Sequence, residues 1–439
     1  MSRPTRTSVH ATLKRSSTGS TLLAVNQYKL GTLLGAGAFG TVYRAINSKP
    51  SAFDKVVAIK VLRRSLLRRK RIGQHGSALE SVAREIAVMK KLEHPNCVKL
   101  FEVIDDPQHD ELFLVMEFLE GGELSNMTRE RPLSEEVARS VVFDVCVGLA
   151  YLHSQGIVHR DIKPSNMLLW QPVTSGGKRF SCLRSLLRHS ARTSELSDSA
   201  HRRMRIKLCD FGVATICDAT KDEEECKEGS LKVMGATGGS YAFFAPEMCE
   251  AGPYNGVKAD MWAMGVSLFL ILFGQLPFEA ETPHLLLNAI RKEEVRWPHI
   301  PTLSSDALDL LRMLLHKDPD QRASLHEARS HPWLTEYGFE MRPENAQRST
   351  DPNKAEIDNA LNLRNDIGCL PPSYVSPAAV LPSFAERTAH RRKSATNLMF
   401  DSLGVIGMLS TSWSRTSKPS HSTNAEVQSN CEYSSALEA

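Results

Sequence analysis

The sequence predicts an α+β fold in which a small antiparallel, β-rich half is followed by a larger, mainly helical half. Short strand-like runs, separated by turns that contain Gly or Pro, occupy the stretch from Tyr28 to Phe118, and one amphipathic helix interrupts them. After Gly122 the apolar residues recur at helical spacing. Hydrophobic residues make up 41% of the 439 residues and charged residues 24%, which is ordinary for a globular protein and excludes disorder along the whole chain.

The individual elements follow from the spacing of the apolar residues. Four runs in the first half have the composition of strands: Lys29–Leu34, Thr41–Ile46, Val56–Leu62 and Leu112–Phe118. The helix predicted over Leu79–Leu92 places four apolar side chains on one face: Leu79, Val82, Ile86 and Met89. The second half contains four predicted helices: Glu135–Ser154, Asp260–Phe273, Ser304–Leu315 and Leu325–Arg329.

These elements predict one folded domain over residues 28–334. Its small lobe covers residues 28–118, and its large lobe covers residues 119–334. A basic insert at about 170–205 interrupts the large lobe, because eight basic residues stand there against two acidic ones. We expect the insert to be a surface loop, and binding of an acidic partner or phosphorylation are the alternatives.

Both ends of the chain are expected to be disordered. Residues 1–27 contain four basic residues, no acidic residue and many Ser and Thr, which favours a disordered tail over a transit peptide. Residues 335–439 are rich in Ser, Thr, Pro and Asn and lose sustained periodicity. We expect them to form a mostly disordered regulatory tail.

Charge and cysteine content restrict the partners and the location. The net charge of +4 comes from the N-terminal tail and the insert, which argues against a nucleic-acid-binding domain. Nine cysteines without a CxxC pair indicate free thiols in a reducing compartment, so we expect a cytoplasmic or nuclear protein. Met261–Phe278 is uncharged over 18 residues, which allows a membrane span or a helix buried on all sides.

A glycine-rich run between two strand-like stretches is the first motif that carries chemistry. Its glycines follow the pattern GxGxxG, and glycine lets a backbone approach phosphate groups closely. In a Rossmann fold a helix would follow the loop, whereas here a second strand-like run follows it. The residues of the run are Leu34, Gly35, Ala36, Gly37, Ala38, Phe39, Gly40, Thr41 and Val42.

Four more motifs follow in order along the chain. They are Val57–Lys60 (VAIK), His159–Asn166 (HRDIKPSN), Asp210–Gly212 (DFG) and Ala245–Glu247 (APE). Each alone could be a loop of satisfied polar groups, but all five motifs in this order essentially exclude chance. On these motifs, the stretch from about Tyr28 to Leu334 resembles the eukaryotic protein kinase family, which implies the bilobal protein-kinase fold.

The resemblance implies transfer of a phosphoryl group from ATP to a protein hydroxyl, with Mg²⁺ as the cofactor. Asp161 would accept or orient the proton of the substrate hydroxyl, and Lys163 would neutralise charge on the transferring group. Asn166 and Asp210 would hold the two magnesium ions. These groups would act by position and charge, because phosphoryl transfer needs little covalent chemistry from the protein.

The resemblance also implies an ATP site between the lobes. Lys60, held by Glu85, would pair with the α- and β-phosphates. Met116 resembles the gatekeeper of the family, and Glu117–Leu119 its adenine-binding hinge. The residues expected around the adenine and the ribose are Val42, Ala58, Met116, Glu117, Leu119, Glu123 and Leu168.

The family pattern explains the uncharged segment as well. It follows Asp260 of a DxWxxG pattern, which in the family opens the buried helix beneath the catalytic loop. A membrane span is therefore not expected. Arg322 falls where the family has an arginine that pairs with the Glu of the APE motif, here Glu247.

Lys163 and five further stretches of the sequence bear on which protein substrate the chain would modify. Lys163 within HRDIKPSN is typical of Ser/Thr-specific kinases. Five stretches resemble the calcium/calmodulin-dependent protein kinase kinases with their plant and fungal relatives: Val25–Tyr28, Glu85–Asn96, Val103–Pro107, Asp260–Ser267 and Phe273–Phe278. The resemblance implies an upstream kinase whose protein substrate is another kinase, of the AMP-activated or calmodulin-dependent type.

Departures from that subfamily leave alternatives open. The stretch 63–74 is basic but shorter than the Arg/Pro-rich insert of the animal enzymes, so a docking patch and a solvated charge run are both possible interpretations. Ala378–Met399 is the nearest candidate for binding calmodulin, but Pro382 interrupts it. A downstream calmodulin-kinase-like enzyme and a pseudokinase scaffold are the rival functions. We expect a monomer.

Regulation is expected at Arg160, which precedes the catalytic aspartate. Such an arginine usually binds an anion of the activation segment. Phosphorylated Ser230 or Thr237 could supply it, and the acidic run 222–225 is the alternative. Ser240 is expected near the substrate hydroxyl instead.

Overall fold

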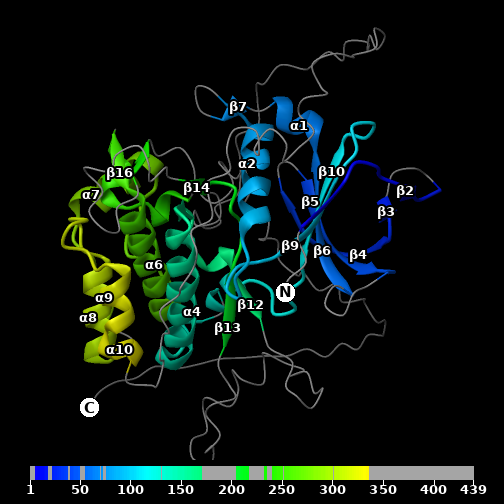
Figure 1. Cartoon of the computed structure of the whole chain (residues 1–439). Helices are drawn as coiled ribbons and strands as arrows, with labels where there is room; N and C mark the ends of the chain where they lie inside the picture. The colour runs from blue at the N-terminus through cyan, green and yellow to red at the C-terminus, as the bar shows by residue number, and fades with distance from the viewer. Residues whose placement is uncertain are drawn as a thin grey trace, which may run out of the picture.

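The computed structural model describes residues 5–17, 22–37, 40–49, 55–69, 71–72, 76–129, 131–170, 204–216, 232–234, 240–250, 252–299 and 301–335. A β-rich lobe and a helical lobe lie side by side (Figure 1). The predicted α+β, bilobal class is confirmed. The described part of the chain includes neither residues 171–203 of the insert nor residues 336–439 of the C-terminal tail.

The small lobe is built on a curled, mainly antiparallel sheet. Its central strands run in the order β9-β10-β6-β5-β4. One face packs against the helix α2 (Ala78–Lys91), which buries the four apolar side chains that the sequence placed on one face. The central strands are β4 (Tyr28–Gly37), β5 (Gly40–Asn47), β6 (Val56–Arg63), β9 (Leu100–Asp105) and β10 (Glu111–Glu117).

The N-terminal segment extends this sheet at both edges. β1 (Arg6–Ser8) pairs in parallel with β9, while β3 (Leu22–Val25) pairs with β4 and β2 (Leu13–Arg15) with β3. The prediction of a disordered tail over 1–27 is therefore wrong for the described residues of that segment. Strands of three or four residues carry almost no periodicity, and their order depends on a sheet formed by later residues.

β1 and β2 stand at opposite ends of the strand order, although only four residues separate them. Five residue steps span at most about 18 Å, so the two edges of the sheet must approach each other. This closure covers the outer face of β6. Val57, Ile59 and Val61 lie there in a second core with Val25 and Tyr28, which explains why β6 is buried on both faces.

Two short elements follow β6. They are the helix α1 (Arg64–Arg69) and the hairpin of β7 (Arg71–Ile72) with β8 (Gly76–Ser77). Arg64 is 8% exposed, forms an ion pair with Asp105, and donates to the carbonyl oxygen of Asp106 at 2.9 Å. Arg64 of the basic stretch 63–74 is thus anchored in the lobe, whereas Arg63, Arg68 and Arg69 are exposed.

The large lobe is mainly helical. Its described helices are α3 (Ser125–Thr128), α4 (Glu135–Ser154), α6 (Gly256–Phe273), α7 (Pro283–Lys292), α8 (Ser305–Leu314), α9 (Leu325–Ser330) and α10 (Pro332–Thr335). Three two-stranded sheets join them: β11 (Ile157–Val158) with β14 (Thr215–Ile216), β12 (Met167–Trp170) with β13 (Arg205–Leu208), and β15 (Lys232–Met234) with β16 (Pro253–Asn255).

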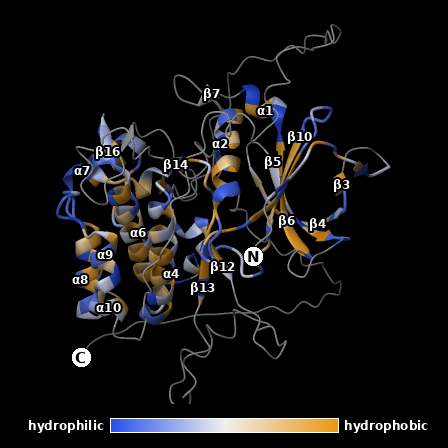
Figure 2. Ribbon diagram, viewed as in Figure 1, coloured by the Kyte–Doolittle hydropathy of each residue, from blue (hydrophilic) through white to orange (hydrophobic). Residues whose placement is uncertain are grey.

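The helix α6 forms the centre of this lobe and packs against α4 and α8. It begins where the Asn255 side chain accepts hydrogen bonds from the next backbone N–H groups, and it ends at Gly274, whose φ is 72°. Two described helices, α4 and α6, are long and apolar enough to cross a membrane, but 61% and 83% of their most apolar stretches are buried inside the protein. Figure 2 shows apolar residues concentrated along α4 and along the strands of the small lobe.

Candidate active site

The glycine-rich run forms the tip of a hairpin. β4 ends at Gly37, β5 begins at Gly40, and these two residues pair. A Cβ at Gly40 would lie 1.8 Å from the carbonyl oxygen of Val61 on β6, so only glycine fits there. A strand follows the run, which excludes a Rossmann phosphate loop. Ala38 and Phe39 lie outside the described residues.

Lys60 on β6 and Glu85 on α2 form a buried ion pair. The Nζ of Lys60 lies 3.1 Å from Oε1 and 3.5 Å from Oε2 of Glu85. Burial by itself lowers the pKa of Lys60, but the carboxylates of Glu85 and Asp210 outweigh it and raise that pKa. The ammonium group therefore stays charged, and the pair ties α2 to the sheet.

Asp161 lies at the centre of a hydrogen-bond network. Its Oδ2 accepts from Nδ2 of Asn166 at 2.9 Å and lies 2.8 Å from Nζ of Lys163. Its Oδ1 accepts from the backbone N–H of Ser240 at 3.1 Å, and Lys163 donates to the Ser240 hydroxyl at 2.7 Å. A carboxylate and an ammonium group of one loop thus converge with a hydroxyl of a second segment, and Ser240 lies beside the carboxylate.

Asp260 on α6 fixes the loop that carries Asp161. Its Oδ1 accepts from the backbone N–H of Arg160 at 2.8 Å, and its Oδ2 from that of His159 at 3.0 Å and from the His153 ring at 2.9 Å. Arg160 and Asp210 have φ of 67° and 65°, a left-handed conformation that is strained for residues other than glycine. The surrounding hydrogen bonds therefore hold the loop in a shape that the chain would not adopt alone.

The Arg160 side chain has neutral partners among the described residues, on the activation segment and on β16. It donates to the hydroxyl of Thr215 at 2.8 Å, to that of Tyr254 at 3.1 Å and to the carbonyl of Val213 at 3.4 Å. Ser230, Thr237 and the acidic run 222–225 lie outside the described residues. The anion expected for Arg160 therefore stays a prediction.

Asp210 is suited to hold a cation. Its Oδ1 is buried without a hydrogen-bond partner among the described residues. Burial raises the pKa of Asp210 to about 8, against the opposing charge of Lys60. Asn166 lies next to it in space, since the Cys209 N–H donates to the Asn166 carbonyl at 3.0 Å. Two oxygen donors from these side chains fit Mg²⁺, which keeps waters and substrate phosphates as its other ligands.

The residues expected around adenine come from both lobes. Val42 and Ala58 are buried in the main core. Met116 and Leu168, on β10 and β12, pack against a small cluster of Val98, Leu119 and Cys209. The structure thus brings the expected aliphatic side chains to the junction of the lobes.

Two titratable groups belong to this junction. Burial raises the pKa of Glu123 to about 7, against a hydrogen bond from the Ser125 hydroxyl, and Glu123 is bridged through its backbone to Leu168. Burial also raises the pKa of the Cys209 thiol well above its usual value, and this residue is 8% exposed. Cys209 is therefore a protonated packing residue and not a reactive thiolate.

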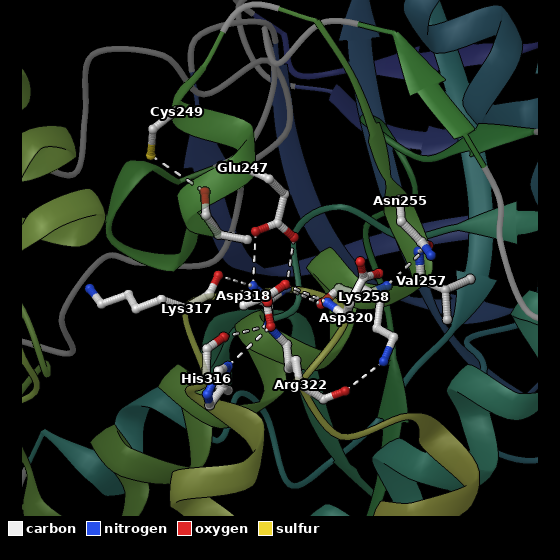
Figure 3. Close-up of polar contacts among 11 residues, drawn as sticks. Glu247, Cys249, Asn255, Val257, Lys258, His316, Lys317, Asp318, Asp320 and Arg322 are labelled. Carbon is white, nitrogen blue, oxygen red and sulfur yellow. Dashed lines mark hydrogen bonds and ion pairs between the residues drawn. The ribbon is translucent and has the colours of Figure 1, made fainter.

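Glu247 and Arg322 form a bidentate ion pair beneath the activation segment (Figure 3). Nη1 lies 2.7 Å from Oε1 and Nη2 lies 2.8 Å from Oε2. The guanidinium group also donates to the carbonyl oxygens of Lys258 and His316, and it stacks over the Trp262 ring at 5.1 Å. The pairing predicted from the sequence is therefore present.

Residues 28–334, more than half of the chain, match the family described as "Protein kinase domain". The chain belongs to the protein kinase family. The resemblance drawn from the five motifs is confirmed, and the relatives that match the chain include serine/threonine-protein kinases. The matched residues are the same as those of the predicted folded domain.

The chain is similar to kinases from a fungus, a nematode and a plant. The chain is 36% identical over 337 residues to the Serine/threonine-protein kinase ssp1 of Schizosaccharomyces pombe, covering 75% of this chain and 45% of that protein. It is 34% identical over 354 residues to the Calcium/calmodulin-dependent protein kinase kinase of Caenorhabditis elegans, covering 77% and 57%. It is 33% identical over 312 residues to the Serine/threonine-protein kinase GRIK1 of Arabidopsis thaliana, covering 71% and 67%. The chain spans about half the length of the first two relatives.

Lys207 on β13 is a residue of this kinase site that the sequence did not suggest. Its Nζ lies 2.8 Å from each carboxylate oxygen of Glu117, the hinge residue, and 5.2 Å from the Trp170 ring centre. It thereby joins the hinge to the hairpin from which the insert emerges. The only signal in the sequence is a lysine three positions before Asp210, and its partner lies 90 positions earlier.

Proposed function

We propose that this kinase acts upstream of other kinases and phosphorylates the activation loop of an AMP-activated-type or calmodulin-dependent kinase. The observation that carries this proposal is the similarity to the relative from C. elegans, whose name describes a kinase of a calmodulin-dependent kinase. The names of the fungal and plant relatives describe serine/threonine-protein kinases, which supports a Ser or Thr hydroxyl as the acceptor. Calmodulin is a further candidate partner of the chain.

The geometry supports transfer to a Ser or Thr hydroxyl. Asp161 would accept the proton of that hydroxyl, because its Oδ1 and Oδ2 are oriented by Ser240 and Asn166. Lys163, between Asp161 and Ser240, would neutralise charge on the transferring group. Lys60, kept charged by Glu85, would bind the α- and β-phosphates.

A divalent cation, which we propose to be Mg²⁺, would neutralise charge on the phosphates when it is bound. Asp210 and Asn166 would hold it, because Asp210 offers a buried oxygen without a hydrogen-bond partner among the described residues and Asn166 lies beside it. The aliphatic residues at the junction of the lobes would enclose the adenine. Glu117 and Leu119 would bind its edge through their backbone, and Glu123 the ribose.

The test is phosphate transfer from Mg-ATP to a catalytically dead AMP-activated-type kinase domain, with and without calcium and calmodulin. We expect phosphate on the activation-loop threonine of the partner, and none with the Asp161→Asn variant. A partner that stays unmodified while this kinase phosphorylates itself or Arg-containing peptides would contradict the upstream role and favour a downstream calmodulin-kinase-like enzyme. Stimulation by calmodulin would establish that partner.

We also propose a monomer in the cytoplasm or nucleus. Among the described residues, Cys146, Cys209 and Cys249 are free thiols, which suits a reducing compartment. Sedimentation of the full chain would test the monomer. Fractionation of cells that express the tagged full chain would test the location.

A further inference from the structure

The N-terminal strap, residues 5–15 with β1 and β2, is attached to the small lobe around one buried carboxylate. Glu102 on β9 is 3% exposed. Its Oε1 accepts from the Ser8 hydroxyl at 2.5 Å, and its Oε2 accepts from the Tyr28 hydroxyl at 2.6 Å and lies 3.2 Å from Nη2 of Arg6. Two of these donors, Ser8 and Arg6, belong to the strap.

The rest of the attachment consists of short contacts at the two edges of the sheet. At the first edge β1 contributes three residues of parallel pairing, the Thr5 hydroxyl donates to the carbonyl of Leu100 at 2.9 Å, and the Ala11 N–H donates to Asp106 at 2.8 Å. At the other edge β2 pairs with β3 over three residues, Asn26 forms hydrogen bonds with Thr12 and His10, and Arg15 forms an ion pair with Glu111. Apolar burial comes only from Ala11 and Leu13, which are partly buried against the second core. A short edge strand of this kind opens locally far more often than the whole domain unfolds.

We propose that Ser8 is a phosphorylation site and that phosphate on Ser8 detaches the strap from the small lobe. The modifying enzyme would be a second Ser/Thr kinase that selects basic residues, since Arg6 and Arg3 stand two and five positions before Ser8. It would act on the open strap. The Oγ–P bond forms as the bond between the γ-phosphorus of ATP and its bridging oxygen breaks, ADP leaves, and the hydroxyl proton passes to the catalytic carboxylate of that enzyme.

The physical basis is repulsion at Glu102. Phosphorylation removes the donor to Oε1 and places about −1.5 to −2 charges beside a buried carboxylate. Arg6 supplies a single positive charge, and its side chain is 55% exposed, so it cannot neutralise both groups. The closed position of the strap then requires two unneutralised negative groups in contact, and the open position becomes the stable one.

Thr7 provides a matched control. Thr7 directly precedes Ser8 on β1 and is exposed, whereas Ser8 is partly buried and donates to Glu102. A phosphate on Thr7 adds the same charge to the same strand without facing that carboxylate. The comparison therefore separates a specific effect at Glu102 from a general effect of charge on the strap.

The experiment uses the full chain with phosphoserine encoded at position 8 or phosphothreonine at position 7, and it follows tryptic cleavage after Lys14 by mass spectrometry. We expect cleavage to accelerate at least about tenfold for phosphoserine 8, and less than about twofold for phosphothreonine 7. Hydrogen exchange of the β9 amides should rise in parallel. Equal rates for phosphorylated and unmodified Ser8, or equal acceleration by both phosphates, would overturn the proposal.

Two further measurements test separately whether repulsion at Glu102 causes the detachment and whether Ser8 can be phosphorylated. In a Glu102→Gln background the phosphate on Ser8 should accelerate cleavage much less, because the opposing carboxylate is gone. An undiminished effect would overturn repulsion at Glu102 as the cause. A purified basophilic kinase should label Ser8 of the unmodified chain, and faster in Glu102→Gln than in wild type. Failure to label Ser8 in either chain would overturn the modification site.

Discussion

Two carboxylates, one in each lobe, bind an arginine in contrasting ways. In the large lobe, Arg322 is fully buried and meets Glu247 with both ends of its guanidinium group (Figure 3). In the small lobe, Arg6 is 55% exposed and reaches Glu102 with one nitrogen. Separation of the first pair would leave the buried guanidinium group of Arg322 without its carboxylate partner. The second leaves its arginine on a terminal segment that can detach.

The two ion pairs differ in how firmly they fix the segments that they join. The Glu247–Arg322 pair joins the end of the activation segment to the loop before α9, and carbonyl oxygens satisfy the remaining donors of Arg322. The Glu102 cluster joins β9 to a strap that crosses the sheet from edge to edge. A buried, bidentate pair fixes geometry, whereas a one-sided pair at an edge allows the strap an equilibrium between closed and open positions.

Breaking the large-lobe pair should have the largest effect. Arg322→Met leaves Glu247 without its partner and removes one donor from each of three carbonyl oxygens, so we expect the free energy of unfolding to fall by about 3–5 kcal/mol. Urea denaturation of the full chain measures it. Arg322→Lys keeps the charge but loses the bidentate geometry, so its free energy of unfolding should lie between those of the wild type and of Arg322→Met. A loss below about 1 kcal/mol for Arg322→Met would refute the rigid character of this pair.

An intermediate pair joins Lys207 to Glu117, with side chains 10% and 21% exposed. Lys207→Met should lower the free energy of unfolding by about 1–2 kcal/mol. Because Glu117 belongs to the hinge, we also expect the KM for ATP to rise about threefold or more while kcat changes little. Steady-state kinetics with varied ATP measure both, and Lys207→Arg should restore most of the KM. A fall in kcat with unchanged KM would show that Lys207 does not position the hinge.

The sequence could predict those parts of the site that lie in contiguous motifs. Lys60, Asp161 and Asp210 stand within short runs of unusual composition. Helical periodicity predicted α2, and the resemblance to the kinase family implied the ion pair of Lys60 with Glu85 on that helix. The strap could not be predicted, because three-residue strands have no period and a basic, Ser-rich composition is also that of a disordered tail. Lys207 was missed since only the folded chain brings it to Glu117.

The smallest effect is expected at the small-lobe pair. Arg6→Ala should lower the free energy of global unfolding by less than about 1 kcal/mol, because water screens the exposed guanidinium group. Hydrogen exchange of β9 amides should nevertheless rise several-fold, since the strap opens without unfolding the lobe. At high salt the difference from wild type should shrink, as expected for an exposed charge. A global destabilisation as large as that of Arg322→Met would mean that the strap is as rigid as the activation-segment anchor, and the contrast between the two carboxylates would not hold.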